Sequence, residues 1–330
     1  MFAYLVRRVV SMVLLLFLLS ISVFFLFNLV PGDPARLTCG KACTPIIIEQ
    51  NRHRLGLDEP VVTQYVKFVT GIFVGRTFSP ESPVPIKCEA PCLGYSFTRH
   101  EEVMSIISRA APTTFFLAIG AFIIWIFFGL SLGIIAALNR GKWADRIIMG
   151  ISLIGYSMPS FFIGLVLIFF VIIKWQFLPF PSYISPWENP FQFFQTMLLP
   201  WIVLASLYAA FYIRLTRNQV LEVLSDDYVR TARAKGLRER RVVVKHALRA
   251  GLTPIVTAAG LDLAGLLGGA IISENIFSLP GLGSLAVSSV TGSDLPVITG
   301  LTMLTASIII FANMVVDVLY AVVDPRVRIS

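Results

Sequence analysis

TTFFLAIGAFIIWIFFGLSLGIIAAL, residues Thr113–Leu138, is a stretch of sequence without a single charged side chain. A helix needs about 20 consecutive apolar residues to cross the hydrocarbon core of a bilayer, which is about 30 Å thick. Lipid offers no hydrogen-bond partners, so only a helix or a closed barrel satisfies the backbone there. Strands of a membrane barrel show alternating segments of about ten residues, whereas this run is continuous. The stretch therefore predicts a transmembrane helix.

Further apolar stretches lie on both sides of this one. The chain has 330 residues, of which 56% are hydrophobic and 14% charged, and its mean hydropathy is +0.79. Soluble domains carry about 25% charged residues, so this composition excludes an ordinary soluble protein. We predict an all-α integral membrane protein with six transmembrane helices. The other five are expected at Val9–Val30, Ile147–Ile173, Met197–Ile213, Leu252–Ser273 and Val297–Val323.

Basic residues orient these helices, because short cytoplasmic loops of membrane proteins are enriched in Lys and Arg. More than half of the 27 Lys and Arg fall on one alternate set of loops, which places both termini in the cytoplasm. The same asymmetry accounts for the net charge of +8, so nucleic acid is not expected as a partner. The residues concerned are Arg7, Arg8, Arg140, Lys142, Arg146, those between Arg214 and Arg249, Arg326 and Arg328.

The predicted spans divide the chain into three parts. Residues 1–30 form an N-terminal transmembrane helix, which we expect to be retained because its apolar run exceeds the roughly 7–15 residues of a signal peptide. Residues 31–111 form an extracytoplasmic lobe, with a helix near Pro45–Leu55. Residues 112–330 hold the other five helices and a cytoplasmic loop at 214–251. The external loop Lys174–Gln195 is rich in aromatic rings, which indicates a membrane interface or, alternatively, a substrate-stacking surface.

The cytoplasmic loop is far too long for a minimal turn, and its sequence predicts two helices. Ser225 is expected to cap the N-terminus of the first helix. This helix runs through Lys235 and is expected to end at Gly236, because glycine is favoured just after a helix C-terminus. The second is expected at Glu239–Leu248. Such an element suits docking into a groove on a soluble partner, or it lies as a basic loop against anionic headgroups. The residues alone leave both interpretations open.

One segment of this loop carries a family resemblance. Tyr228–Pro254, YVRTARAKGLRERRVVVKHALRAGLTP, resembles the cytoplasmic loop of permease subunits of bacterial ABC importers, and more narrowly the B-type subunits of the oligopeptide, dipeptide and nickel group. The general permease motif opens with Glu-Ala-Ala, whereas Arg230, Thr231 and Ala232 stand here. Gly236 falls at the expected spacing, and Pro254 lies further on than the general motif places its proline.

Other fragments extend the resemblance over nearly the whole chain, because their order and spacing also fit the subgroup. They are Tyr4–Arg8, Pro31–Pro34, Leu55–Pro60, Gly94–Phe97, Asn139–Asp145, Ser157–Phe162, Gly268–Ala270, Glu274–Phe277, Pro280–Gly283 and Asp324–Arg326.

The resemblance implies a type I ABC importer permease fold, with a five-helix core plus an N-terminal helix and an external lobe. It implies that the chain forms half of a translocation pathway for di- or oligopeptides. Expected partners are a homologous C-type permease subunit, two ATPase subunits that bind ATP and Mg, an extracytoplasmic substrate-binding protein, and lipid of the bacterial inner membrane. Nickel, an oligosaccharide or another small solute is the alternative substrate. The expected ATPase-coupling residues are Asp227, Tyr228, Arg230, Thr231, Ala232, Ala234, Lys235 and Gly236.

Asp262 lies midway along the fifth apolar stretch, where a carboxylate costs about 2.5–3.5 kcal/mol on insertion scales. It is therefore expected to face a cavity or a partner group. We consider two roles, lining the translocation path and a structural hydrogen bond to a neighbouring helix or subunit. Nearby small residues, including Gly260, Gly265 and Gly268, predict a close helix–helix contact.

The four cysteines, Cys39, Cys43, Cys88 and Cys92, all lie in the external lobe as two C-x3-C pairs. Because the lobe faces an oxidising compartment, disulfides are expected, with three possible connectivities. Ligation of a metal by the four thiolates is the alternative.

The sequence shows no arrangement of residues typical of an enzyme. No G-x-x-x-x-G-K-S/T motif occurs, so ATP hydrolysis must come from another chain. Gly281-x-Gly283 lacks the preceding strand that a phosphate-binding loop requires. His53, His100 and His246 are scattered, so neither a catalytic metal site nor a cofactor is expected. A stand-alone secondary transporter or channel would predict inverted repeats or several intramembrane charges.

Overall fold

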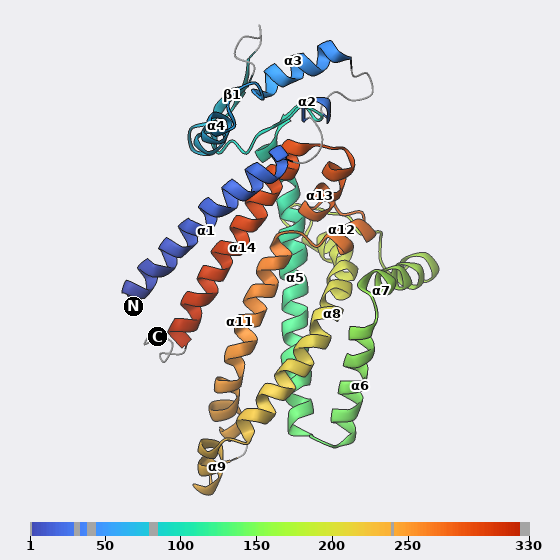
Figure 1. The fold of residues 1–330 in the computed structure, drawn as a ribbon. Coiled ribbons are helices and arrows are strands. Elements are labelled where there is room, and N and C mark those ends of the chain that lie inside the picture. The colour runs from blue at the N-terminus through green and yellow to red at the C-terminus, as the bar shows by residue number, and fades with distance from the viewer. Residues whose placement is uncertain (1, 30–33, 38–43, 79–84, 239–240, 324–330) are drawn as a thin grey trace.

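The computed structural model describes residues 2–29, 34–37, 44–78, 85–238 and 241–323, and these are mostly helical (Figure 1). The lobe and its neighbours comprise α1 (Phe2–Leu29), α2 (Pro34–Leu37), α3 (Pro45–Leu55), α4 (Val61–Val74), β1 (Arg76–Phe78), β2 (Ile86–Cys88), β3 (Tyr95–Ser96) and β4 (Glu101–Glu102). The remainder comprises α5 (Val103–Leu138), α6 (Trp143–Ser157), α7 (Ser160–Leu167), the π-helical η1 (Ile168–Lys174), α8 (Pro190–Leu224), α9 (Asp227–Ala234), the π-helical η2 (Val242–Ala247), α11 (Leu248–Leu267), α12 (Ile271–Ile276), α13 (Leu282–Thr291) and α14 (Leu295–Val323).

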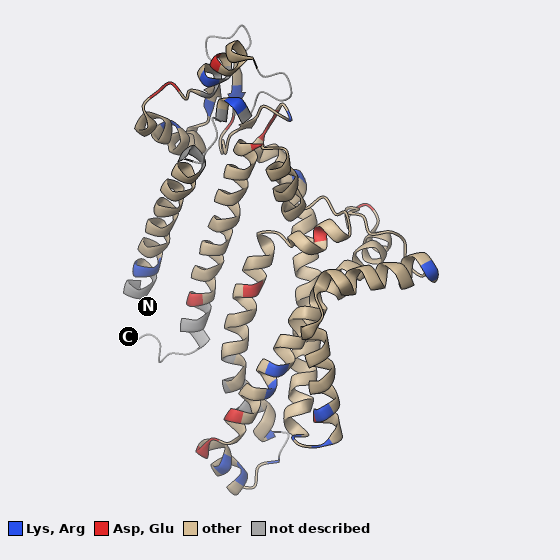
Figure 2. Cartoon of the chain, turned by 45° about the vertical axis from the view of Figure 1, so that its right-hand side comes forward, with Lys and Arg blue, Asp and Glu red and all other residues tan. Residues whose placement is uncertain are grey.

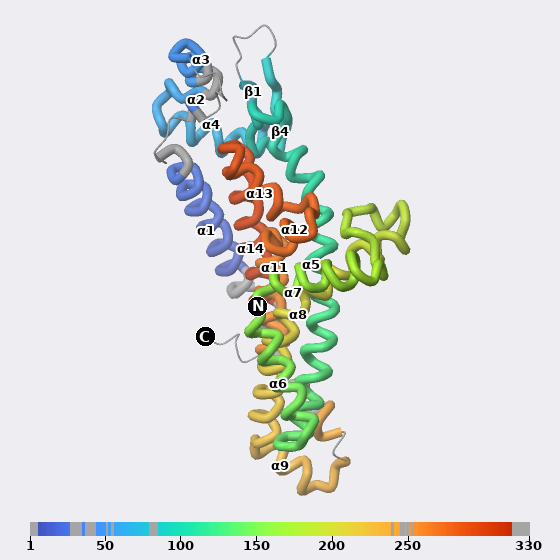
Figure 3. Tube along the Cα trace, turned by 90° about the vertical axis from the view of Figure 1, so that its right-hand side faces the viewer, coloured from blue at the N-terminus to red at the C-terminus, as the bar shows by residue number. Residues whose placement is uncertain are grey.

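The long helices form an elongated bundle with the lobe at one end and α9 at the other (Figures 1 and 3). Helices α5 and α8 pack against one another along much of their length, and α11 lies against α5, α8 and α14. Helix α1 lies on the outer side of α14, where Arg8 forms an ion pair with Asp317 at 2.8 Å. The N-terminal end of α1 and the C-terminal end of α14 therefore lie side by side, short of the end that carries α9 (Figure 1).

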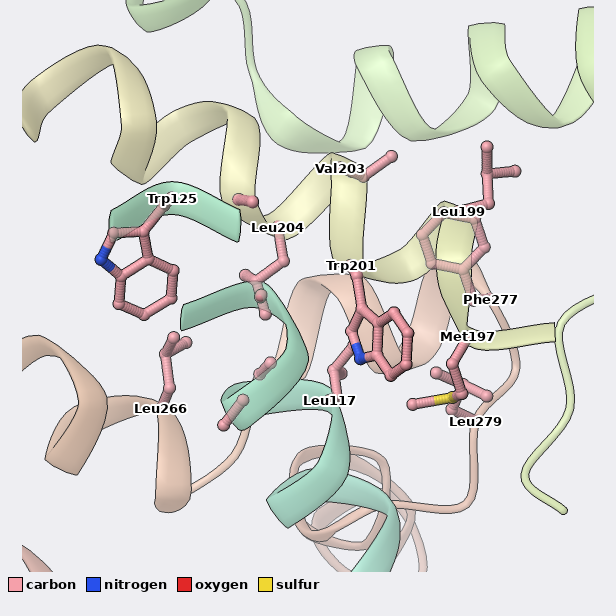
Figure 4. Packing of buried hydrophobic residues seen from close by; sticks show 14 of the residues in the cluster. Leu117, Trp125, Met197, Leu199, Trp201, Val203, Leu204, Leu266, Phe277 and Leu279 are labelled. Carbon is pink, nitrogen blue, oxygen red and sulfur yellow. The ribbon is translucent and has the colours of Figure 1, made fainter. Parts of the chain in front are cut away.

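Glycines on α5 allow α8 to approach unusually closely. A Cβ atom added at Gly129 would lie 2.6 Å from the Cβ of Tyr212, and one at Gly133 would lie 2.6 Å from the Cβ of Thr216. Because small residues let membrane helices pack backbone to backbone, this contact fixes α5 against α8. The buried core beside it collects Leu117, Trp125, Met197 and Trp201 with residues of α11 and of the segment after α12 (Figure 4).

Most of the predicted spans meet the length and composition needed to cross a bilayer. In the part of the chain that the structure describes, four helices do so, and they are Val6–Leu26 of α1, α5, α8 and Leu295–Val318 of α14. The pair formed by α6 and α7–η1 meets the same test as one bent unit. The remaining predicted segment, Leu252–Ser273, corresponds to α11, whose apolar part, Pro254–Leu267, is shorter but lies inside the same bundle.

The prediction of one continuous helix over Ile147–Ile173 is wrong. The helix breaks after Ser157, and the two halves meet at an angle of 97°. Met158 adopts an extended backbone, and Pro159 precedes the first residue of α7. Proline lacks an N–H and disfavours helical geometry in the residue before it, which accounts for the break.

The predicted span Leu252–Ser273 is wrong at its C-terminal end, because α11 stops at Leu267. Gly269 follows with φ +125°, a conformation that side chains disfavour. A Cβ there would also lie 2.8 Å from the backbone nitrogen of Gly283. The chain therefore turns at Gly268-Gly269 and begins the short helix α12.

The lobe combines α2–α4 with two small antiparallel hairpins, β1–β2 and β3–β4. The predicted helix at Pro45–Leu55 is confirmed as α3, whose first turn is capped by the Thr44 hydroxyl. Helix α5 begins at Val103, inside the stretch assigned to the lobe from sequence. Between α4 and β2, Arg76 stacks on the Phe78 ring at 4.3 Å, and burial lowers the pKa of Arg76 to about 10.

Candidate functional site

Helix α9 projects at the end of the molecule opposite the lobe, where several Lys and Arg residues lie along the chain (Figures 1 and 2). The predicted helix is confirmed, and Gly236 ends it with φ +74°. The expected cap is wrong, because Ser225 belongs to the end of α8 and donates its hydroxyl to the Glu222 carbonyl at 2.6 Å. Asp226 occupies the N-cap position instead. Of the predicted second helix, residues 239–240 lie outside the described residues, and η2 runs without a break into α11.

Two faces of α9 differ sharply in burial. Val229 and Ala232 are buried against Val223 of α8 and Val242 of η2, which seats the helix on the end of the bundle. Ala232, one of the predicted coupling residues, therefore lies on the side of α9 that packs against the bundle. The other predicted coupling residues are exposed, namely Asp227, Tyr228, Arg230, Thr231, Ala234, Lys235 and Gly236.

The exposed face carries charges of both signs. Asp227 lies in the first turn, where the helix dipole favours a carboxylate, and it approaches Arg230 to 3.7 Å. Partial burial, and then the charge of Asp226, raise the pKa of the Tyr228 phenol. The face thus combines an aromatic ring with charges of both signs. Such a face suits a protein partner better than anionic lipid, which favours a uniformly basic face.

A buried ion pair supports the bundle above α9. Arg217 of α8 donates from Nε to Asp145 Oδ1 at 2.6 Å and from a terminal nitrogen to Oδ2 at 2.9 Å. The Gly141 N–H also donates to Asp145, at 2.9 Å. Such a two-point contact fixes orientation as well as distance. The turn between α5 and α6 is therefore tied to the helix that carries α9.

Asp262 lies inside the bundle and accepts a hydrogen bond from the Tyr212 hydroxyl of α8 at 2.6 Å. Tyr212 is fully buried, whereas Asp262 is half-buried. The Trp125 ring of α5 stacks on Tyr208 with centroids 4.6 Å apart. The structural hydrogen bond that we considered for Asp262 is thus present, and the half-exposed carboxylate still has a face directed away from Tyr212.

The small residues around Asp262 pack mainly on a neighbouring helix of the same chain. A Cβ at Gly260 would lie 2.4 Å from a methyl group of Val316 on α14, and one at Gly268 would lie 3.5 Å from Thr305. Gly265 has nothing within 4 Å. Two of these glycines therefore mark the contact between α11 and α14.

At the lobe end, Glu274 of α12 forms a buried hydrogen-bond centre whose role sequence reasoning did not identify. Its Oε1 accepts from the Thr114 hydroxyl at 2.8 Å and from the Ala270 N–H at 3.1 Å, and Oε2 accepts from the Ser284 N–H at 2.8 Å. Thr114 in turn accepts from the Leu282 N–H at 2.8 Å. The carboxylate thereby joins α5, α12 and the start of α13.

The same contact explains the glycines of the turn before α13. A Cβ at Gly281 would lie 2.4 Å from the carboxyl carbon of Glu274, and one at Gly283 would lie 2.7 Å from the Ile271 backbone. The sequence signal of this site is Glu274 followed by Gly281 and Gly283. This signal can be interpreted only once the fold is known.

The lobe is fastened to this end by a second carboxylate. The Ser96 hydroxyl donates to Asp294 Oδ2 at 2.6 Å, and Arg99 approaches the same oxygen to 3.6 Å. Cys88 and Cys92 form a disulfide within the lobe, while Cys39 and Cys43 lie outside the described residues. Among the described residues, no group of three or more His, Cys, Asp or Glu is placed to hold a metal ion.

Known proteins resemble this chain along its whole length. Residues 129–329 match the binding-protein-dependent transport system inner membrane component family, and residues 1–118 match the N-terminal part of such membrane components. A putative peptide transport system permease protein of Brucella abortus is 35% identical over 330 residues, 99% of each chain. The glutathione transport system permease protein of Escherichia coli K12 is 37% identical over 328 residues, again 99% of each.

The fold agrees with these relatives. Two crystal forms of the inward-facing MetNI methionine ABC transporter give TM-scores of 0.54 and 0.55 at 19% identity, over 67% of this chain and 97% of theirs. Fold and surface together define a multi-pass membrane permease of the type I ABC importer class. The chain belongs to the family of binding-protein-dependent transport system inner membrane components, as the resemblance of its cytoplasmic loop predicted. Members of this family are membrane subunits without enzymatic activity of their own, and an importer of this kind works with an ATPase and a substrate-binding protein.

Proposed function

We propose that this chain is the B-type permease of a peptide importer in the bacterial inner membrane, with both termini in the cytoplasm. It pairs with a homologous C-type permease, and each of the two permeases seats on one of two ATPase subunits that bind ATP and Mg. The printed functions of the relatives, peptide and glutathione transport, support di- or oligopeptides as the substrate. Nickel or an oligosaccharide stays the alternative within the family.

The observation that carries the proposal is the division of α9 into a buried and an exposed face. Its inner side packs on Val223 and Val242 of the chain itself, and the residues of its outer side are exposed in the part of the chain that the structure describes. An isolated helix of eight residues is too short to be stable in water. Packing on α8 and η2 therefore presents the outer face as a preformed docking element for the ATPase subunit.

The ATPase contact is tested by reversing one charge on α9 with a matched reversal elsewhere. Arg230 is exposed and Arg52 is partly exposed, and each approaches an acidic residue one turn earlier, at 3.7 and 3.8 Å. We expect Arg230→Glu to reduce ATPase co-purification and substrate uptake about tenfold, which corresponds to a loss of about 1.4 kcal/mol of binding. Arg52→Glu, on the lobe, is expected to leave both unchanged. Normal ATPase binding and uptake with Arg230→Glu would contradict the proposal.

Within the same proposal, Asp262 lines the translocation path. Its support is a carboxylate at membrane depth that is only half-buried and that contacts Tyr212 through one oxygen. A solute with a cationic ammonium group would meet its exposed side. A stand-alone transporter or channel would need more such groups, and Asp262 was the sole charge that we identified deep in a predicted span.

Two substitutions separate a path role of Asp262 from a structural role. Tyr212→Phe removes the hydrogen bond and keeps the carboxylate, whereas Asp262→Asn removes the charge and keeps an acceptor. We expect uptake by assembled complexes to fall with Asp262→Asn and to change little with Tyr212→Phe. Equal uptake by the two variants would show that Asp262 has a structural role and no role in the translocation path.

A further inference from the structure

Helix α4 of the lobe packs against the outer part of α1. The Ser20 hydroxyl and the Tyr65 hydroxyl lie 2.8 Å apart and share a hydrogen bond. The rings of Phe24 and Phe68 are 5.6 Å apart between centroids, and Val23, Phe24, Phe68 and Met303 form a buried cluster between α1, α4 and α14. Helix α4 is therefore held at a fixed height along α1.

That height lies inside the apolar span. The part of α1 able to cross the bilayer is Val6–Leu26, and Ser20 precedes Leu26 by about 9 Å at 1.5 Å per residue. Tyr65 thus contacts α1 below the end of its apolar span. The helix that carries Tyr65 lies beside the membrane boundary, although the sequence assigned it to an extracytoplasmic lobe.

Three faces can be distinguished around α4. The face toward α1 carries Tyr65, Phe68 and Ile72. A second face carries Val62, Val66 and Phe73, which fall within an arc of about 40° at 3.6 residues per turn. These three side chains are 71%, 51% and 77% exposed.

The third face of α4 carries Thr63, Lys67 and Thr70, all exposed, and is polar except for the exposed Val74 at the C-terminal end of the helix. Lys67 forms an ion pair with Glu59 just before the helix. A helix with one apolar and one polar exposed face is typical of segments that lie in the plane of a membrane interface, with the apolar side about 5–10 Å deep.

We propose that α4 lies flat in the interface of the leaflet on the lobe's side of the membrane, with lipid covering Val62, Val66 and Phe73. The apolar face continues the lipid-facing surface of α1, where Phe25 stacks on Tyr65 and Leu26 is 60% exposed. Lipid, rather than a protein partner, is favoured because the contact with α1 places this face at the level of a membrane span. This inference requires membrane insertion of α1 and is independent of the ATPase contact and of the substrate.

The test compares two faces of the same helix in the full-length chain. A fluorescent amino acid is introduced by stop-codon suppression at position 66 or 73, and, as controls, at position 63 or 70. The protein is reconstituted in nanodiscs of phosphatidylethanolamine and phosphatidylglycerol, with or without lipids brominated on the acyl chains. All four positions are exposed, so the probe displaces no buried side chain.

We expect brominated lipid to quench the probe at 66 and 73 at least about threefold more than at 63 and 70, and aqueous iodide to show the opposite order, as an interfacial helix requires. Quenching by iodide at 66 and 73 as strong as at the controls would overturn the proposal, because the face would then be in water. Protection of 66 and 73 from both quenchers would also overturn it, because protein would then cover the face.

Discussion

The two ends of the bundle are stabilised in opposite ways. At the lobe end, Glu274 is fully buried and each of its oxygens is hydrogen-bonded by groups of the same chain. At the other end, α9 rests on a small apolar cluster and leaves its outer face exposed. Burying a carboxylate is costly unless donors replace water, so the lobe end is complete within this chain. The α9 end presents an exposed surface, and we propose that another molecule docks on it.

The largest loss of stability is expected when the hydrogen bonds of Glu274 at the lobe end are removed. Glu274→Ala would leave the Thr114 hydroxyl and the N–H groups of Ala270 and Ser284 without their acceptor, at about 1–3 kcal/mol for each buried group. We expect the apparent melting temperature of the purified protein in detergent to fall by on the order of 5–10 °C. Glu188→Ala, an exposed glutamate, is the control and should change it little. An apparent melting temperature of the Glu274→Ala protein equal to that of the unmodified protein would refute the contrast between the two ends.

An intermediate effect is expected at the Asp145–Arg217 pair, which ties the turn between α5 and α6 to the helix that carries α9. Breaking one partner of a buried pair costs about 3–5 kcal/mol because the other charge is left behind. Asp145→Asn and Arg217→Gln are therefore each expected to lower the apparent melting temperature. The double variant should lose much less than the sum of the two, with a coupling of about 1–3 kcal/mol. Additive losses would mean that the pair contributes no coupling.

The smallest effect is expected within α9 itself. Val229→Ala removes two methyl groups from a cluster of only a few side chains, at a cost of about 1–2 kcal/mol. The loss should stay local, so protease cleavage between α8 and η2 should accelerate while the apparent melting temperature of the bundle is unchanged. Thr231→Ala, on the exposed face, is the control. A fall in global melting temperature with Val229→Ala would show that α9 is integrated into the bundle as firmly as α12.

Sequence patterns predicted the elements that depend on local composition. The apolar runs located the long helices, and α3 begins at Pro45 and ends at Leu55 as predicted. The helical segment that ends at Gly236 was predictable because glycine is favoured just after a helix C-terminus. Val229 and Ala232, spaced i and i+3 among polar residues, were a usable sign of a buried face, and that sign was missed.

Other features depend on contacts between distant residues and were not predictable in this way. Glu274 reads as one more polar residue at the end of an apolar stretch until Thr114, 160 positions earlier, is placed beside it. The bend at Pro159 had a local signal, but apolar residues on both sides of it satisfied the composition of a single span. Asp262 was recognised from its depth, while its partner Tyr212 became known only from the packing of α11 on α8.

The close approach of α5 and α8 at Gly129 and Gly133 restricts how this molecule changes shape. Because no layer of side chains separates the two helices at these glycines, we expect α5 and α8 to move together as one rigid unit. The helical hydrogen-bond ladder is interrupted beside this pair at Pro159 and at Gly268-Gly269, among other places. We therefore expect any change of shape in this chain to move α7 and α12–α13 relative to α5 and α8, which serve as the frame.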